Sequence, residues 1–119
     1  MPKQKTIPQL LKQAQIVFNR FIRERDKDKG CISCGSPNVD HASHYIAQGS
    51  CSYLRFHETN VNGSCVKCNT FMHGNLIGYR KGLIERYSVA DVEMLEDHRH
   101  VTKKWTRSEL LEIIEKYKL

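Results

Sequence analysis

Two Cys-x-x-Cys pairs constrain this chain most: Cys31 with Cys34, and Cys65 with Cys68. Each pair can present two sulfurs from one tight turn, and two pairs complete the tetrahedron of thiolates that Zn²⁺ binds at about 2.3 Å. No secretory signal opens the chain, so we expect a reducing cytoplasm, where such pairs are metal ligands rather than disulfides. A thioredoxin-like redox pair is the rival interpretation, but no βαβ pattern surrounds either pair. We therefore predict a closed structural zinc site, with the fifth cysteine, Cys51, in the core.

A basic helix is predicted before the first cysteine pair. Thr6 can cap it, Pro8 fits its first turn, and the polar run 26–30 ends it. Its apolar stripe has helical spacing and comprises Leu10, Leu11, Ala14, Val17, Phe18, Phe21 and Ile22. Residues 1–30 carry eight Lys/Arg and three acidic residues, which is most of the net charge of +6. This charge favours a polyanionic partner such as DNA.

Four basic residues are candidate phosphate contacts. Lys12, Arg20 and Arg23 fall largely off the apolar stripe, and Lys67 lies inside the second cysteine turn. A solvated helix face that binds nothing explains the first three equally well. No segment approaches the roughly 20 apolar residues that a membrane span needs, so we expect no membrane partner.

The region between the cysteine pairs has no helical period. Short strands are expected over 41–47 and 51–56, with a turn at Gly49 and Ser50.

Helices are expected after the second cysteine pair. One should begin near Cys65, be interrupted at Gly74 and resume as far as Tyr87. A partial capping box at 88–91 predicts a short helix to about residue 98. A full capping box at 106–109 predicts a last helix, with Trp105 as a hydrophobic staple on Leu110. The fold class is therefore α+β.

A second set of polar residues surrounds the cysteines: His44 in an expected strand, Asn60, Asn69 directly after Cys68, and His73 four residues later. On a continuous helix, Asn69 and His73 would share one face. Phosphodiester cleavage needs a base to activate water and a metal to offset charge on the leaving oxygen. Mg²⁺ needs only one or two protein ligands because it keeps most of its waters.

The motifs His44-Tyr45, Asn60-Val61 and Cys65-Val-Lys-Cys68-Asn69 resemble the HNH, or ββα-metal (His-Me finger), nuclease pattern. The whole chain is similar to the phage recombination nucleases called NinG or Rap. Further segments carry this similarity: Lys5–Lys12, Cys31–Gly35, Leu54–Phe56, Gly74–Leu76, Gly82–Glu85 and Trp105-Thr106. The Cys68-Asn69 step also resembles phage endonuclease VII, a four-cysteine junction resolvase.

The resemblance implies a role for each polar residue. His44 would be the general base, and Asn60 would hold the loop before the helix through backbone hydrogen bonds. Asn69 would bind a catalytic Mg²⁺ or Mn²⁺, and His73 would be a further ligand or a phosphate contact.

One position departs from the pattern. Many HNH enzymes have Asp just before the base, where this chain has Ser43. Asp40 or His41 is then expected to supply the missing metal ligand. Because side chains alternate along a strand, His41 would need a bend or bulge to join His44.

Together these expectations describe a basic helix at 1–30, a zinc-bound ββα-metal core at 31–87 and C-terminal helices at 88–119. The resemblance implies a metal-dependent endonuclease that cuts branched recombination intermediates, such as Holliday junctions and D-loops. It also implies a phage- or prophage-encoded protein in the bacterial cytoplasm. A homodimer would then be plausible, because a resolvase must place two active sites on two strands. A non-catalytic zinc-stabilised DNA-binding module and a sequence-specific homing-type HNH nuclease are the alternatives.

Overall fold

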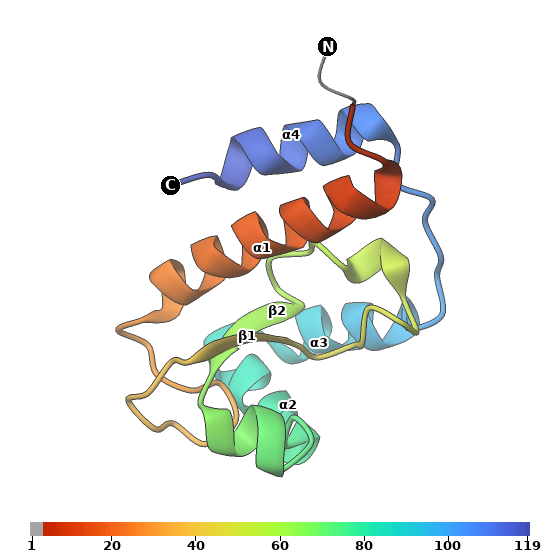
Figure 1. Cartoon of the computed structure of the whole chain (residues 1–119). Helices are drawn as coiled ribbons and strands as arrows, with labels where there is room; N and C mark the ends of the chain where they lie inside the picture. Colours follow the sequence, from red (N-terminus) through yellow and green to blue (C-terminus); the bar gives the residue numbers. More distant parts are fainter. Residues whose placement is uncertain (1–3) are drawn as a thin grey trace.

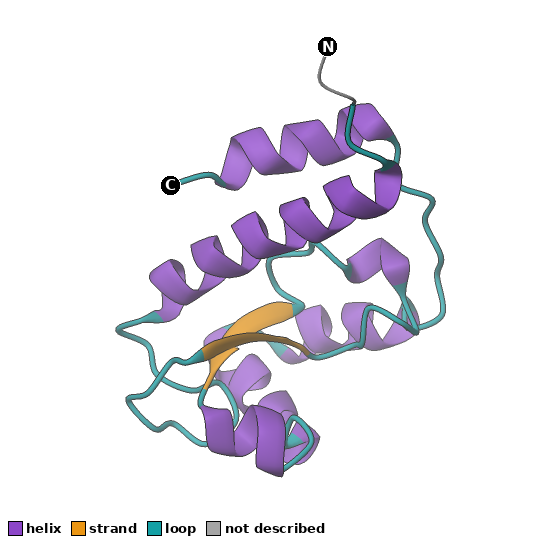
Figure 2. Cartoon of the chain, in the orientation of Figure 1, coloured by secondary structure: helices purple, strands orange, loops and turns teal. Residues whose placement is uncertain are grey.

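A computed structural model describes residues 4–119 and has a small antiparallel hairpin between two helical layers. Helices α1 and α4 lie on one side of the hairpin, and α2 and α3 lie on the other (Figure 1). Colouring by secondary structure shows how little strand the fold contains (Figure 2). The elements are α1 (Ile7–Asp26), β1 (His41–His44), a 3₁₀ turn (Ser52–Leu54), β2 (Val61–Ser64), a π-helical turn (Lys67–Phe71), α2 (Leu76–Arg86), α3 (Val89–Asp97) and α4 (Arg107–Tyr117). The α+β prediction is confirmed.

The first helix begins as predicted. Thr6 Oγ1 accepts a hydrogen bond from Gln9 N at 3.3 Å, and Gln9 Oε1 accepts one from Thr6 N at 2.8 Å. This reciprocal capping box satisfies two backbone donors that a helix start leaves unpaired. The helix buries Leu10, Ala14, Phe18 and Ile22 at four-residue intervals.

Two hydrophobic clusters lie on the two sides of the hairpin. The first joins α1, α4 and the hairpin, and Phe18 and Tyr117 meet there edge to face with ring centroids 4.7 Å apart. The second joins α2 and α3 to the 3₁₀ turn and contains Cys51 and Tyr79. The prediction that Cys51 is a core residue is confirmed, since its side chain is fully buried and its thiol donates to the His98 carbonyl. Among the helices at residues 4–119, none has the length and apolar character to cross a membrane.

The second strand was predicted in the wrong place. It spans Val61–Ser64 and pairs with β1 in a register that runs from His41 opposite Ser64 to His44 opposite Val61. The segment predicted as a strand, 51–56, instead contains the 3₁₀ turn, whose Ser52 is anchored to the linker before α4. Asn and Gly are poor strand formers, so β2 carried little sequence signal. Burial on both faces determines its structure.

The helix predicted to start at Cys65 is interrupted where expected. The π-helical turn ends at Phe71, and His73, Gly74 and Asn75 all have positive φ, of 50°, 93° and 47°. Glycine adopts this left-handed region without strain, and Asn tolerates it. The helix then resumes as α2 at residue 76.

The two C-terminal capping predictions differ in outcome. Thr106 and Glu109 form both halves of a capping box at the start of α4. Ser88 caps α3 by accepting from Asp91 N, but the Asp91 carboxylate accepts from the Ser88 hydroxyl instead of its backbone N–H. Trp105 packs on the cluster that contains Leu110. Its ring meets that of Phe56 edge to face, with the ring centroids 5.0 Å apart.

Candidate metal centre and polar site

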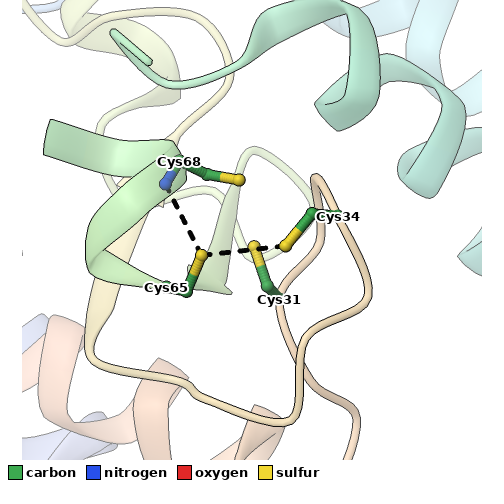
Figure 3. Close-up of side chains that lie close together, drawn as sticks. All are labelled: Cys31, Cys34, Cys65 and Cys68. Atoms are coloured by element: carbon green, nitrogen blue, oxygen red, sulfur yellow. Dashed lines mark hydrogen bonds between the residues drawn. The ribbon is translucent and has the colours of Figure 1, made fainter. Parts of the chain in front are cut away.

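The four paired cysteines converge on one point. Cys31 and Cys34 come from the loop after α1, and Cys65 and Cys68 from the end of β2 and the turn that follows (Figure 3). Their sulfur atoms all lie within 4.8 Å of one another, and Cys34 Sγ is 3.7 Å from Cys65 Sγ. Tetrahedral zinc with Zn–S distances of about 2.3 Å places its sulfurs about 3.8 Å apart. The donor set and its spacing therefore fit a structural Zn²⁺.

The backbone around Cys31 favours its thiolate form. Burial raises the pKa of Cys31, but backbone N–H groups of Cys65, Cys34 and Ser33 point at its sulfur and lower the pKa to about 7. Gly35, with φ of 78°, closes this turn by donating to the Cys31 carbonyl at 2.9 Å. A low pKa at Cys31 suits a metal ligand, because the thiolate is the species that binds. The other thiols differ: burial and the neighbouring thiols raise the pKa of Cys68 to about 12. At Cys34 the Ser36 N–H lowers the pKa, but burial and the neighbouring thiols outweigh it, so that its pKa is also raised.

Helix α2 lies directly against the first cysteine turn. A Cβ at Gly78 would lie 2.2 Å from the Ser33 carbonyl oxygen, and one at Gly82 would lie 1.9 Å from that of Ile32. Only glycine permits this approach of helix to backbone. Two glycines four residues apart were the available sequence signal for this contact, and it was missed.

His41 and Asn69 meet beside the second cysteine turn. Asn69 Nδ2 lies 2.9 Å from His41 Nδ1, although the residues are 28 positions apart. The amide nitrogen donates, so the ring nitrogen accepts. Among residues 4–119 the Asn69 Oδ1 atom accepts no protein hydrogen bond, which leaves it free to bind a metal. Asp40 is also held at the second cysteine turn, because its carboxylate accepts a hydrogen bond from Val66 N at 3.0 Å.

His44 ends β1 and its ring is held by the loop between the strands. Its Nε2 lies 2.9 Å from the Arg55 carbonyl oxygen. A carbonyl only accepts, so Nε2 carries the proton and Nδ1 is left able to accept one. Burial lowers the pKa of His44, the hydrogen bond to the Arg55 carbonyl opposes this, and the Arg55 charge adds to the decrease. The ring is therefore neutral at physiological pH.

The structure does not bring His41 and His44 to one face. The register of β1 with β2 is continuous across all four residues, so no bulge interrupts it. Side chains alternate along a strand, and residues three apart point to opposite sides. The bend that would join the two histidines is absent from β1.

Asn60 and Tyr79 organise the backbone around the site. Buried Asn60 accepts from Ile46 N at 2.8 Å and donates to the carbonyls of Ile46 at 3.0 Å and Leu54 at 3.2 Å. The Tyr79 hydroxyl donates to the Ser43 carbonyl at 2.6 Å. Sequence reasoning assigned Tyr79 only to an apolar stripe, because nothing in a periodic pattern marks which tyrosine hydroxyl is buried.

The remaining candidates lie at the surface. His73 is exposed, and its predicted place one helical turn after Asn69 on a shared face is wrong, because the helical turn ends at Phe71. Lys12, Arg20 and Lys67 are exposed, and Arg23 is half-buried.

This geometry defines a class: a small α+β protein whose four clustered cysteines could hold a metal ion, with a His/Asn pair beside them. Comparison with known proteins identifies the family. The model for the family described as "Bacteriophage Lambda NinG protein" matches residues 2–119, and the chain belongs to this family.

Three relatives illustrate the similarity, all named "Protein ninG". Those of Salmonella phage P22 and Escherichia phage lambda are 43% and 41% identical over 109 residues, which cover 90% of this chain and 53% of each relative. That of Escherichia phage 933W is 42% identical, over 90% of this chain and 54% of its own length. The chain thus spans about half the length of these curated relatives. No solved structure is significantly similar to it.

Proposed function

We propose that this protein is a metal-dependent endonuclease of the HNH, or ββα-metal, type that cuts branched DNA during phage recombination, as the nucleases called NinG or Rap would. The observation that carries the proposal is the 2.9 Å contact between His41 and Asn69. Both residues are candidate metal ligands by sequence, and they contact each other beside the four-cysteine cluster, where Asn69 directly follows Cys68. The chain order of two antiparallel strands followed by a helical turn supports the same interpretation.

In this proposal His44 is the general base. Its Nδ1 takes a proton from the attacking water, while Nε2–H donates to the Arg55 carbonyl and fixes the ring. A neutral ring is required, and burial supplies it by lowering the pKa of His44. Asn60 acts as a positioning residue, since it holds the Leu54 carbonyl one residue before Arg55.

Oxygen atoms of Asn69 and Asp40 would hold Mg²⁺ or Mn²⁺, with His41 orienting the Asn69 amide. When bound, the metal supplies positive charge that offsets the charge on the leaving oxygen. A zinc ion held by Cys68 would fix Asn69 indirectly, because Cys68 directly precedes it in the chain. Lys12, Arg20, Arg23 and Lys67 are the proposed phosphate contacts, with His73 as a further contact.

The test is cleavage of a four-way DNA junction with Mg²⁺ or Mn²⁺. His44→Ala and Asn69→Ala should each slow cutting by about 100-fold or more while junction binding persists. His100→Ala is the matched control, because His100 is exposed and belongs to none of the proposed sites. The rate should rise with pH and level off above an apparent pKa below 6.5, the ordinary value for histidine. Loss of cutting in all three variants would refute these assignments.

A non-catalytic zinc-stabilised DNA-binding module is the second candidate. The placement of His41 and His44 on opposite faces of β1 favours it, since a nuclease must bring base and metal to one phosphate. Both candidates predict that affinity falls with salt as Lys and Arg displace counterions. Only the nuclease cuts. A homodimer, which would place two active sites on two strands, is part of the nuclease proposal.

A further inference from the structure

Five large apolar side chains are exposed within twelve residues that follow the second cysteine turn. This apolar ridge comprises Val66, Phe71, Met72, Leu76 and Ile77. Ile77 is 78% exposed and Phe71 is 73% exposed, more than any other large apolar side chain described at residues 4–119. Contiguous exposed apolar patches mark interaction sites, whereas single scattered apolar residues are ordinary.

The ridge is held firmly, although it lies outside the core. Cys68 of the four-cysteine cluster falls within its span, and Cys65 directly precedes it. Gly74 N donates to the Cys68 carbonyl at 2.8 Å, and Asn75 Nδ2 donates to Cys68 Sγ at 3.5 Å. The fold therefore presents these side chains on a fixed support, which limits the entropy lost on binding.

The surroundings of the ridge suit a polyanion. Exposed Lys67 lies within the ridge segment, residues 66–77, which contains no acidic residue. Asp40 accepts a hydrogen bond from Val66 N at 3.0 Å, and Arg80, three residues after the ridge, is paired with Glu96 at 3.0 Å, so Lys67 is the basic side chain that the ridge offers. Asn69, one of the proposed metal ligands, belongs to the same five-residue turn as Phe71. The exposed apolar side chains together with Lys67 suit an occupant that has both apolar faces and anionic groups, as DNA has.

We propose that the ridge, with Phe71 foremost, stacks against bases left unstacked at the branch point of a DNA junction. This inference rests on the proposed function, because it places the branch point beside Asn69. Bases of a continuous duplex have no free face, whereas a branch exposes them to aromatic stacking and to apolar wedges. The ridge thereby supplies the preference for branched over linear DNA.

The experiment measures affinity for a four-way junction and for its linear duplex, using the zinc-loaded 119-residue chain without added Mg²⁺ or Mn²⁺. Phe71→Ala should bind the junction about 5- to 100-fold more weakly and the duplex within about twofold of wild type. Phe71→Trp should restore junction affinity because it keeps a stacking face, and Phe71→Leu should not. Leu111→Ala is the matched control, since Leu111 is 50% exposed on α4.

A 2-aminopurine base at the branch point reports stacking directly. Its fluorescence should change on binding wild type and remain unchanged with Phe71→Ala. An unchanged junction-to-duplex affinity ratio in Phe71→Ala overturns the proposal. So does sedimentation showing that Phe71→Ala converts a dimer to a monomer, because the ridge is then a contact between copies. If wild type prefers the junction through Phe71 but never cuts it, the nuclease proposal fails and the ridge proposal stands.

Discussion

Replacing Asp26 by asparagine tests how the end of α1 is fixed to β2. The fully buried carboxylate accepts from Arg25 Nε at 2.7 Å, Arg25 Nη2 at 2.9 Å and Gly63 N at 2.8 Å. Arg86 Nη1 lies 3.7 Å away. Asparagine keeps the shape but not the charge, so two arginine side chains, 16% and 19% exposed, lose this counter-ion.

Removing one partner of a buried ion pair costs about 3–5 kcal/mol, because the other charge remains buried. That is a large part of the roughly 5–15 kcal/mol that stabilises a domain. Urea unfolding at neutral pH and fixed excess Zn²⁺ measures the difference without changing metal occupancy. Asp28→Asn is the matched control, because Asp28 is exposed in the next turn, and it should cost less than about 0.5 kcal/mol.

The pH dependence gives a second readout. Burial raises the pKa of Asp26, but the hydrogen bonds from Arg25 and Gly63 N–H outweigh it, so the pKa lies below the ordinary 3.8. Such a group stabilises the fold above its unfolded pKa, and the contribution is lost as pH falls through the folded pKa. The difference between wild type and Asp26→Asn should therefore stay constant above about pH 5. A difference under about 1 kcal/mol, or one matched by Asp28→Asn, would refute the reasoning.

Two further substitutions test the metal centre and its support. Cys65→Ser should lose the zinc, and circular dichroism should show that the middle of the chain unfolds, since such sites contribute about 10–16 kcal/mol in small zinc peptides. Cys51→Ser is the control and should keep its zinc. Equal zinc content in both variants would contradict the assignment. Gly82→Ala should lower the unfolding free energy by about 1–3 kcal/mol, because its Cβ meets the Ile32 carbonyl. Gly49→Ala, where a Cβ has open space, should change it by about 1 kcal/mol or less; equal effects would show that α2 does not lie tightly on the cysteine turn.

Local signals in the sequence predicted most of the helices. The capping boxes that begin at Thr6 and Thr106 fix two helix starts, because their hydrogen bonds join residues three apart. The four-cysteine cluster was also predictable, since ligand type and spacing define the chemistry. The interruption at Gly74 followed from the conformational freedom of glycine.

Features set by distant contacts were not predictable. Strand β2 contains Asn62 and Gly63 and exists because both its faces are buried, which a local pattern does not show. Asp26 was assigned to a polar turn, but it is the fully buried last residue of α1. The contact of His41 with Asn69 joins residues 28 positions apart, so it depends on how the hairpin and the second cysteine turn pack and not on a local pattern.

Cleavage of a synthetic four-way DNA junction, compared with a linear duplex of matched sequence, tests the central claim most directly. With Mg²⁺ or Mn²⁺, wild type should cut the junction in preference to the duplex, and chelation should stop the reaction. His44→Ala should bind the junction with unchanged affinity, and its cleavage rate should be lower by about 100-fold or more. A wild-type protein that binds the junction but leaves it intact with either metal would contradict the account and favour the DNA-binding module.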